Sequence, residues 1–187
     1  MSVKMFKDSF LEVKSVKNLC IISILMAMNL TLCFVGTIKL TDYAHISFGF
    51  LVFFIVGTMY GPVVSFLFGF FADILGFYVR ANFIGVSGRF HLGFTLTSVL
   101  SATFYGLFLY KYKLNASRVI IVEIVKDLIC NWFLNSLFLA QLLFNNDFKL
   151  AFFARLPKEC CCIVINCVLV LILANSLKRV AKGLNLN

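Results

Sequence analysis

Long apolar stretches alternate with short polar ones along almost the whole chain. Six apolar segments can be drawn, at about residues 18–38, 46–59, 62–79, 92–110, 119–144 and 160–177. A bilayer core about 30 Å thick needs roughly 20 apolar residues per helix, so most of these segments are long enough to cross it. The pattern predicts an all-α integral membrane protein, in which six transmembrane helices form one domain over residues 1–187.

A turn signal separates the second segment from the third. The second segment is short and ends at Tyr60-Gly61-Pro62, a combination typical of turns. We therefore expect the second and third segments to form a tight helical hairpin. Small residues recur every four positions, at Gly57, Gly61, Ser65 and Gly69, which predicts a face that another helix can approach closely.

One acidic residue, Asp73, follows this series inside the apolar third segment. A lone carboxylate among apolar residues needs a partner or water. Arg80 near the outer end of the segment is one candidate partner, and a polar pocket is the other possibility.

The composition supports the prediction of a membrane protein, because it excludes an ordinary soluble domain. Hydrophobic residues make up 61% of the chain, which contains 23 phenylalanines, and no ordinary soluble domain has such a composition. The net charge of +9 raises the possibility of nucleic-acid binding. However, the basic residues lie mostly at the ends of apolar runs, as they do in membrane proteins. We therefore expect no nucleic-acid partner. The seven cysteines are interpreted as buried free thiols, with no metal site.

The distribution of basic residues predicts the topology. With six passes, both termini face one side, and that side holds eleven of the 17 Lys and Arg residues. By the positive-inside rule, both termini and the N-terminal segment 1–17 are expected to be cytoplasmic. No small-residue cleavage site follows the first apolar run, so we interpret it as a retained helix.

Six basic residues face outward against this bias. Snorkelling to lipid headgroups accounts for Lys39 and Lys149. The other four gather in two expected external loops that face the same compartment, at 80–95 and 145–158, and for them we favour anion binding. They are Arg80, Arg89, Arg155 and Lys158.

The fifth segment combines amides with nearby charges. Asn131 and Asn135 lie one turn apart on one face, next to Trp132. An asparagine in hydrocarbon must find hydrogen-bond partners, so both face the bundle interior or a water-filled cavity. Hydrogen bonding between helices and ligand contact both remain open. Glu123 and Asp127, beside Lys126, are interpreted as solvated helix charges.

Catalytic motifs are missing from the sequence. It has only two histidines, and no metalloprotease, serine-hydrolase or phosphate-binding-loop motif. We therefore expect a protein that is not an enzyme and has no ATPase site or cofactor of its own. Uphill transport would then need a partner or an ion gradient.

Four stretches of the chain carry a further signal: HISFGFLVFFIVGTMYGPVVSFLFGFFADILG (45–76), GFTLTSVLSATFYGLFLY (93–110), NWFLNSLFL (131–139) and ARLPK (154–158). Together they resemble one family, the substrate-binding S components of energy-coupling factor (ECF) vitamin transporters, and within it the folate-type branch. The resemblance covers over a third of the chain. It implies a six-helix bundle with an outward-facing vitamin pocket, which helices four to six line and the first and third external loops close.

The resemblance also implies partners. Ser23-x-x-x-Ala27 is similar to the family's small-xxx-small face on the first helix, which docks on a transmembrane coupling subunit. Two cytoplasmic ATPases drive that subunit, and the S component topples in the membrane to carry its vitamin inward. This implies a location in the plasma membrane of a bacterium, and no chemistry on the substrate.

With folate as the ligand, the resemblance suggests roles for nine residues around a lid at 80–91. Arg80, Arg89, Arg155 and Lys158 would neutralise the glutamate carboxylates. Phe90 and Trp132 would stack on the pteridine ring, and His91, Asn131 and Asn135 would hydrogen-bond its heteroatoms. The alternatives are another vitamin or precursor (riboflavin, thiamine or pantothenate), a small ion-coupled secondary transporter or channel, and a membrane scaffold without a ligand.

Overall fold

A computed structural model describes residues 3–35, 38–41, 44–84, 90–143 and 147–183. The helices are α1 (Val3–Lys14), α2 (Val16–Val35), α3 (Phe50–Val79), α4 (Leu92–Leu109), α5 (Ala116–Lys126), α6 (Asn135–Leu143) and α7 (Phe148–Gly183). Two π-helical segments, η1 (Arg80–Ile84) and η2 (Asp127–Leu134), extend α3 and join α5 to α6. The strands β1 (Ile38–Thr41) and β2 (Ala44–Ile46) lie between α2 and α3.

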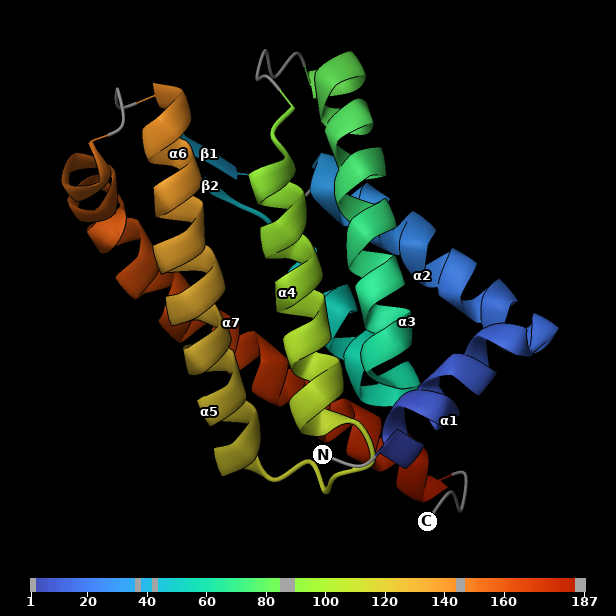
Figure 1. Cartoon of the computed structure of the whole chain (residues 1–187). Coiled ribbons are helices and arrows are strands. Elements are labelled where there is room, and N and C mark those ends of the chain that lie inside the picture. Colours follow the sequence, from blue (N-terminus) through green and yellow to red (C-terminus); the bar gives the residue numbers. More distant parts are fainter. Residues whose placement is uncertain (1–2, 36–37, 42–43, 85–89, 144–146, 184–187) are drawn as a thin grey trace.

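In the described residues, six helical rods form the predicted bundle. They are α2, the two arms of α3, α4, the continuous rod α5–η2–α6, and α7. By length and composition, α2, α3, α4 and α7 are apolar enough to cross a membrane. The first helix, α1, and the last turns of α7 lie at the same end of the bundle (Figure 1).

The predicted hairpin is confirmed, because α3 folds back on itself at Gly61. This residue has φ 83° and ψ −172°, a conformation that glycine adopts far more readily than other residues. The rings of Phe53 and Phe68 lie 6.0 Å apart, whereas a straight helix would separate them by about 22 Å. Ser9 of α1 stabilises this turn, because its hydroxyl donates to the Tyr60 carbonyl (2.7 Å) and accepts from the amide of Val63 (3.1 Å).

The predicted small-residue face is where α3 meets α4. A Cβ atom on Gly57 would lie 2.5 Å from the Cβ of Tyr105, and one on Gly69 would lie 2.9 Å from the backbone of α4. The structure also gives Asp73 its partners, because the hydroxyls of Thr95 (2.8 Å) and Ser98 (3.2 Å) on α4 donate to its carboxylate. Hydroxyls of a neighbouring helix, rather than Arg80, therefore satisfy this half-buried acid.

Replacing Gly106 with alanine is expected to prevent correct folding. The added methyl would lie 2.6 Å from the Cα of Pro62, and backbone atoms at the α3 turn cannot move aside cheaply. Gly76→Ala is the matched control, since its methyl would meet only the end of the Arg80 side chain, at 3.3 Å. Size-exclusion profiles and melting temperatures in detergent should show loss of folded protein for Gly106→Ala alone. Equal behaviour of the two variants would contradict the tight α3–α4 contact.

Two of the expected loops contain regular secondary structure. Residues 38–41 and 44–46 form a short antiparallel pair, in which Ile38 pairs with Ile46 and Lys39 with His45, in a fold that is otherwise helical, as expected. β-branched residues favour such an extended backbone. The segment 145–158 was expected to be an external loop, but α7 already begins at Phe148. Asp147 caps it by accepting a hydrogen bond from the amide of Leu150 (3.2 Å).

Candidate ligand-binding site

Most of the predicted ligand-binding residues lie in the half of the bundle away from the chain termini. They come from the start of α4, from η2 and α6, and from the first turns of α7, which approach one another at that end (Figure 1). The lid predicted at 80–91 begins with the helical turn η1, not with a loop. Arg89 lies outside the described residues, so its role and that of the lid stay predictions.

An aromatic pair joins η2 to α7. The indole of Trp132 stacks on the ring of Phe152, with centroids 4.5 Å apart and planes 12° from parallel. The indole nitrogen also donates to the Phe152 carbonyl (3.3 Å). We call this pair the aromatic shelf. Because Phe152 already covers one face of Trp132, only the other face is left for a ligand.

Next to the shelf, α7 carries a buried ionic group that we call the α7 trio: Arg155, Lys158 and Glu159. The Glu159 carboxylate pairs with Arg155 (2.5 Å) and Lys158 (2.9 Å). Arg155 is 5% exposed and its Nε has no hydrogen-bond partner in the described structure. Two cations and one anion leave a net charge of +1 and one unused buried donor. This arrangement suits an anion, because buried donors without partners are costly.

Sequence reasoning missed Glu159, which neutralises half of the positive charge expected there. The available signal was the spacing, since Arg155 and Glu159 are four residues apart and share a helix face. Treating 145–158 as a loop hid that signal.

The residues at the start of α4 and the end of α3 have other contacts. The Nδ1 atom of His91 accepts from the amide of Gly93 (3.1 Å) and so caps α4, while its ring lies 5.6 Å from that of Phe138. Phe90 is 42% exposed and packs on Phe77 (5.2 Å). Within the described chain, neither Arg80 nor Phe90 forms an ion pair or ring contact with α7. The structure therefore brings His91 to α6 but does not join Arg80 to the α7 trio.

Asn131 takes part in a hydrogen-bond chain between helices. Its amide donates to one oxygen of Asp127 (2.5 Å), and Asn166 of α7 donates to the other (3.0 Å). Asn131 therefore forms a hydrogen bond within the bundle, and its contact with a ligand stays a prediction. Asn135 is half-buried, and it shares the same rod.

The expectation of solvated charges in the fifth segment is wrong. Lys126 pairs with Glu123 and with Asp127, both at 2.8 Å, and all three side chains are at most 1% exposed. The hydroxyl of Tyr105 donates to Glu123 (2.5 Å) and accepts from Lys126 (3.1 Å). We call these four residues the buried charge network. It links α4 with the α5–η2 rod and, through Asp127, with Asn131 and α7.

The reason for this error is geometric. Charges three and four residues apart share a helix face whether that face meets water or another helix. Here α5 and η2 present this face to α4 and α7, where the charges satisfy one another. Phe50 and Tyr105 also place their rings 5.4 and 5.2 Å from the Lys126 ammonium, which further compensates the buried cation.

Comparison with known proteins identifies the family. Residues 17–174 match the family model of the ECF transporter, substrate-specific component. The folate transporter FolT of Clostridium novyi (strain NT) is 31% identical over 152 residues, which cover 80% of this chain and 85% of that protein. The folate transporter FolT of Leuconostoc mesenteroides is 32% identical over 129 residues, or 67% of this chain and 65% of that one.

A solved structure agrees with these relatives. The crystal structure of FolT bound with folic acid superposes with a TM-score of 0.76 at 25% sequence identity, covering 86% of this chain and 94% of that one. The family match runs from the start of α2 through most of α7 and so includes all six rods. The chain is therefore a multi-pass membrane protein that belongs to the family of substrate-specific components of ECF transporters.

Proposed function

We propose that this chain is the folate-binding subunit of an ECF-type importer. The observation that carries the proposal is the position of the aromatic shelf, one helical turn from the α7 trio with its unused buried donor. Folate has a flat pteridine ring for the first and glutamate carboxylates for the second. The two relatives named as folate transporters support the same ligand.

The proposed binding mode gives each part of the site a task. The α7 trio holds the glutamate carboxylates, and the free face of Trp132 stacks on the pteridine ring. His91 and Asn135, with Asn131 held in place by Asp127, hydrogen-bond the ring heteroatoms. Phe90, Arg80 and Arg89 belong to the lid that closes over the ligand.

The proposed partner surface is on α2, the candidate span with the smallest buried share. Ser23 and Ala27 are both exposed, and the Ser23 hydroxyl is turned back onto its own helix, where it donates to the Leu19 carbonyl (2.8 Å). A smooth exposed strip of this kind lets another helix approach closely. We propose that it docks on the coupling subunit, which two cytoplasmic ATPases drive.

The proposed topology follows from the charges. The end of the bundle with both termini carries most of the basic residues, so it faces the cytoplasm of a bacterium. The ligand site then faces outward, and delivery requires the whole subunit to reorient in the plasma membrane. In this proposal the chain has no ATPase site and leaves its substrate chemically unchanged.

Enlarging Ala27 is expected to uncouple transport without affecting folate binding. Ala27→Phe puts a ring on the docking strip and keeps the coupling subunit away, whereas the site lies on other helices. Val164→Phe is the control, since Val164 is 64% exposed on α7. Co-purification with the coupling subunit and ATPases should be lost for Ala27→Phe only. Retained co-purification would remove this strip from the interface.

The ligand can be tested directly, because Trp132 is the only tryptophan and belongs to the aromatic shelf. The purified protein is titrated with folate, 5-formyltetrahydrofolate, riboflavin, thiamine and pantothenate while its fluorescence is followed. We expect saturable quenching by the two folates alone. Calorimetry on the same samples detects binding that leaves the fluorescence of Trp132 unchanged. Binding of another vitamin would overturn the substrate, and binding of none would favour a channel or a scaffold.

A further inference from the structure

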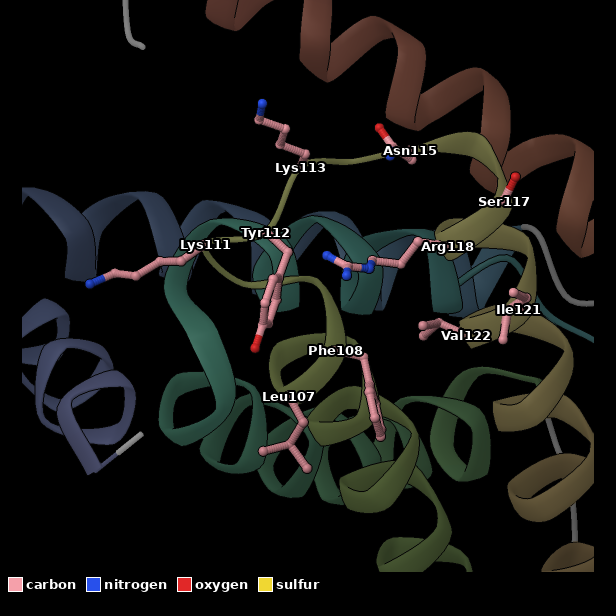
Figure 2. Close-up of a pocket in the computed structure, with 10 residues that line it drawn as sticks. All are labelled: Leu107, Phe108, Lys111, Tyr112, Lys113, Asn115, Ser117, Arg118, Ile121 and Val122. Carbon is pink, nitrogen blue, oxygen red and sulfur yellow. The ribbon is translucent and has the colours of Figure 1, made fainter. Parts of the chain in front are cut away.

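A groove of about 930 Å³ opens where α4 gives way to α5, at the end of the bundle that holds the termini (Figure 2). Phe108 of α4 and Ile121 of α5 contribute apolar walls, and Tyr112, Lys113 and Arg118 contribute its polar side. None of the predicted ligand-binding residues lines it. The groove is therefore separate from the vitamin site.

The groove offers positive charge that the described protein does not neutralise. The Arg118 guanidinium lies over the ring of Tyr112, 4.5 Å from its centroid, and Figure 2 shows the end of Arg118 pointing toward that ring. Among the described residues, no acidic side chain pairs with Lys113 or Arg118. Lys111 differs, because it pairs with Asp8 of α1. This hydrogen bond raises the pKa of Lys111 above its ordinary value.

The groove lies along the bundle at the level expected for the membrane surface. The apolar span of α4 ends at Leu109, so Tyr112 and Arg118 lie at the level where aromatic and basic residues contact headgroups. Ile121 is one helical turn deeper than Arg118 on the same face. Ile121 is 61% exposed and Phe108 is 45% exposed. The groove thus has a cationic rim above an exposed apolar wall.

We propose that this groove binds an anionic phospholipid. Lys113 and Arg118 hold the phosphate, and an acyl chain lies against Phe108 and Ile121. A free phosphate would leave the apolar wall unused, and an acidic protein segment would have to cover hydrocarbon at lipid depth. A phospholipid fits both parts of the groove, because its phosphate meets the cationic rim and its acyl chain meets the deeper apolar wall. The proposal depends on the membrane orientation and not on the identity of the vitamin.

The test is native mass spectrometry of the full chain in detergent with dioleoylphosphatidylglycerol or dioleoylphosphatidylcholine. We expect the phosphatidylglycerol adduct to dominate, and to fall about tenfold or more in Lys113→Gln/Arg118→Gln. The matched control, Lys178→Gln/Arg179→Gln, removes the same charge from exposed positions on α7 and should keep the adduct. Equal loss in both variants, or no loss in the groove variant, would overturn the proposal.

Two further measurements separate the possible sources of the anion. A hundredfold excess of inorganic phosphate should leave the phosphatidylglycerol adduct in place, whereas displacement would indicate a site for free phosphate and overturn the lipid. The groove variant should still co-purify with the coupling subunit. If it lost that subunit while keeping its lipid, the occupant would be an acidic segment of a protein. Unchanged vitamin binding by the groove variant verifies that it is folded.

Discussion

Replacing Lys126 with methionine is expected to destabilise the protein by about 3–5 kcal/mol. Lys126 is 1% exposed and is the cation that pairs with both Glu123 and Asp127. Methionine fills a similar volume but leaves two buried carboxylates close together without the cation that pairs with them. Such an uncompensated charge is much more costly than the loss of an exposed ion pair. Thermal unfolding in detergent, followed by circular dichroism, should show a large decrease in the midpoint.

Two variants show whether charge or packing is responsible. Lys178→Met removes an exposed lysine from the same end of the bundle and should leave the midpoint unchanged. The triple variant Glu123→Gln/Lys126→Met/Asp127→Asn makes the buried charge network neutral and should recover most of the lost stability, because neutral replacements avoid the desolvation cost. If the single and triple variants were equally unstable, packing around Lys126 and not its charge would be the cause.

The second large effect is expected at Arg155, with folate as the ligand. Glu159 occupies one terminal nitrogen of its guanidinium, and Nε is buried without a partner in the described structure. In the proposed binding mode this N–H donates to a glutamate carboxylate of folate. Arg155→Lys keeps the positive charge but lacks the planar donor fork. Loss of one charge-assisted hydrogen bond should weaken folate binding at least about tenfold in a calorimetric titration.

A shortened ligand provides the control for this prediction. Pteroate has the pteridine ring but lacks the glutamate, so it should bind the native protein and Arg155→Lys with equal affinity. Lys149→Gln, which removes an exposed lysine near the start of α7, should leave folate binding unchanged. Equal weakening of folate and pteroate would mean that the substitution distorts the site. An unchanged folate affinity would remove Arg155 from it.

The two experiments address different parts of the molecule. The buried charge network holds α4, η2 and α7 together, so its loss should lower stability with every ligand. In the α7 trio, the Nε of Arg155 has no hydrogen-bond partner in the described structure. Loss of this donor should therefore weaken binding only for a ligand whose carboxylate reaches it. Asn131 bonds to Asp127 of the buried charge network, and in the proposed binding mode it also contacts the ligand. Replacing it is therefore expected to affect both stability and binding.

Much of the fold could be predicted because membrane helices are long apolar segments. The six segments, the turn at Gly61 and the close approach at Gly57 all follow from residue types that the backbone or the bilayer requires. The start of α7 was missed although Asp147 offers a capping oxygen. A polar residue between apolar segments is equally consistent with a loop.

The sequence by itself determined that this chain spans a membrane, where it turns and which family it resembles. Only the tertiary structure decided which helix faces meet, and thereby which charges are buried. In a soluble protein, apolar residues mark the interior, but in a bilayer both the interior and the lipid-facing surface are apolar. Phe66 and Phe71 are about half exposed, whereas Glu123 and Lys126 are almost completely buried. Helical periodicity shows which residues share a face, and packing against α4 and α7 determines what that face contacts.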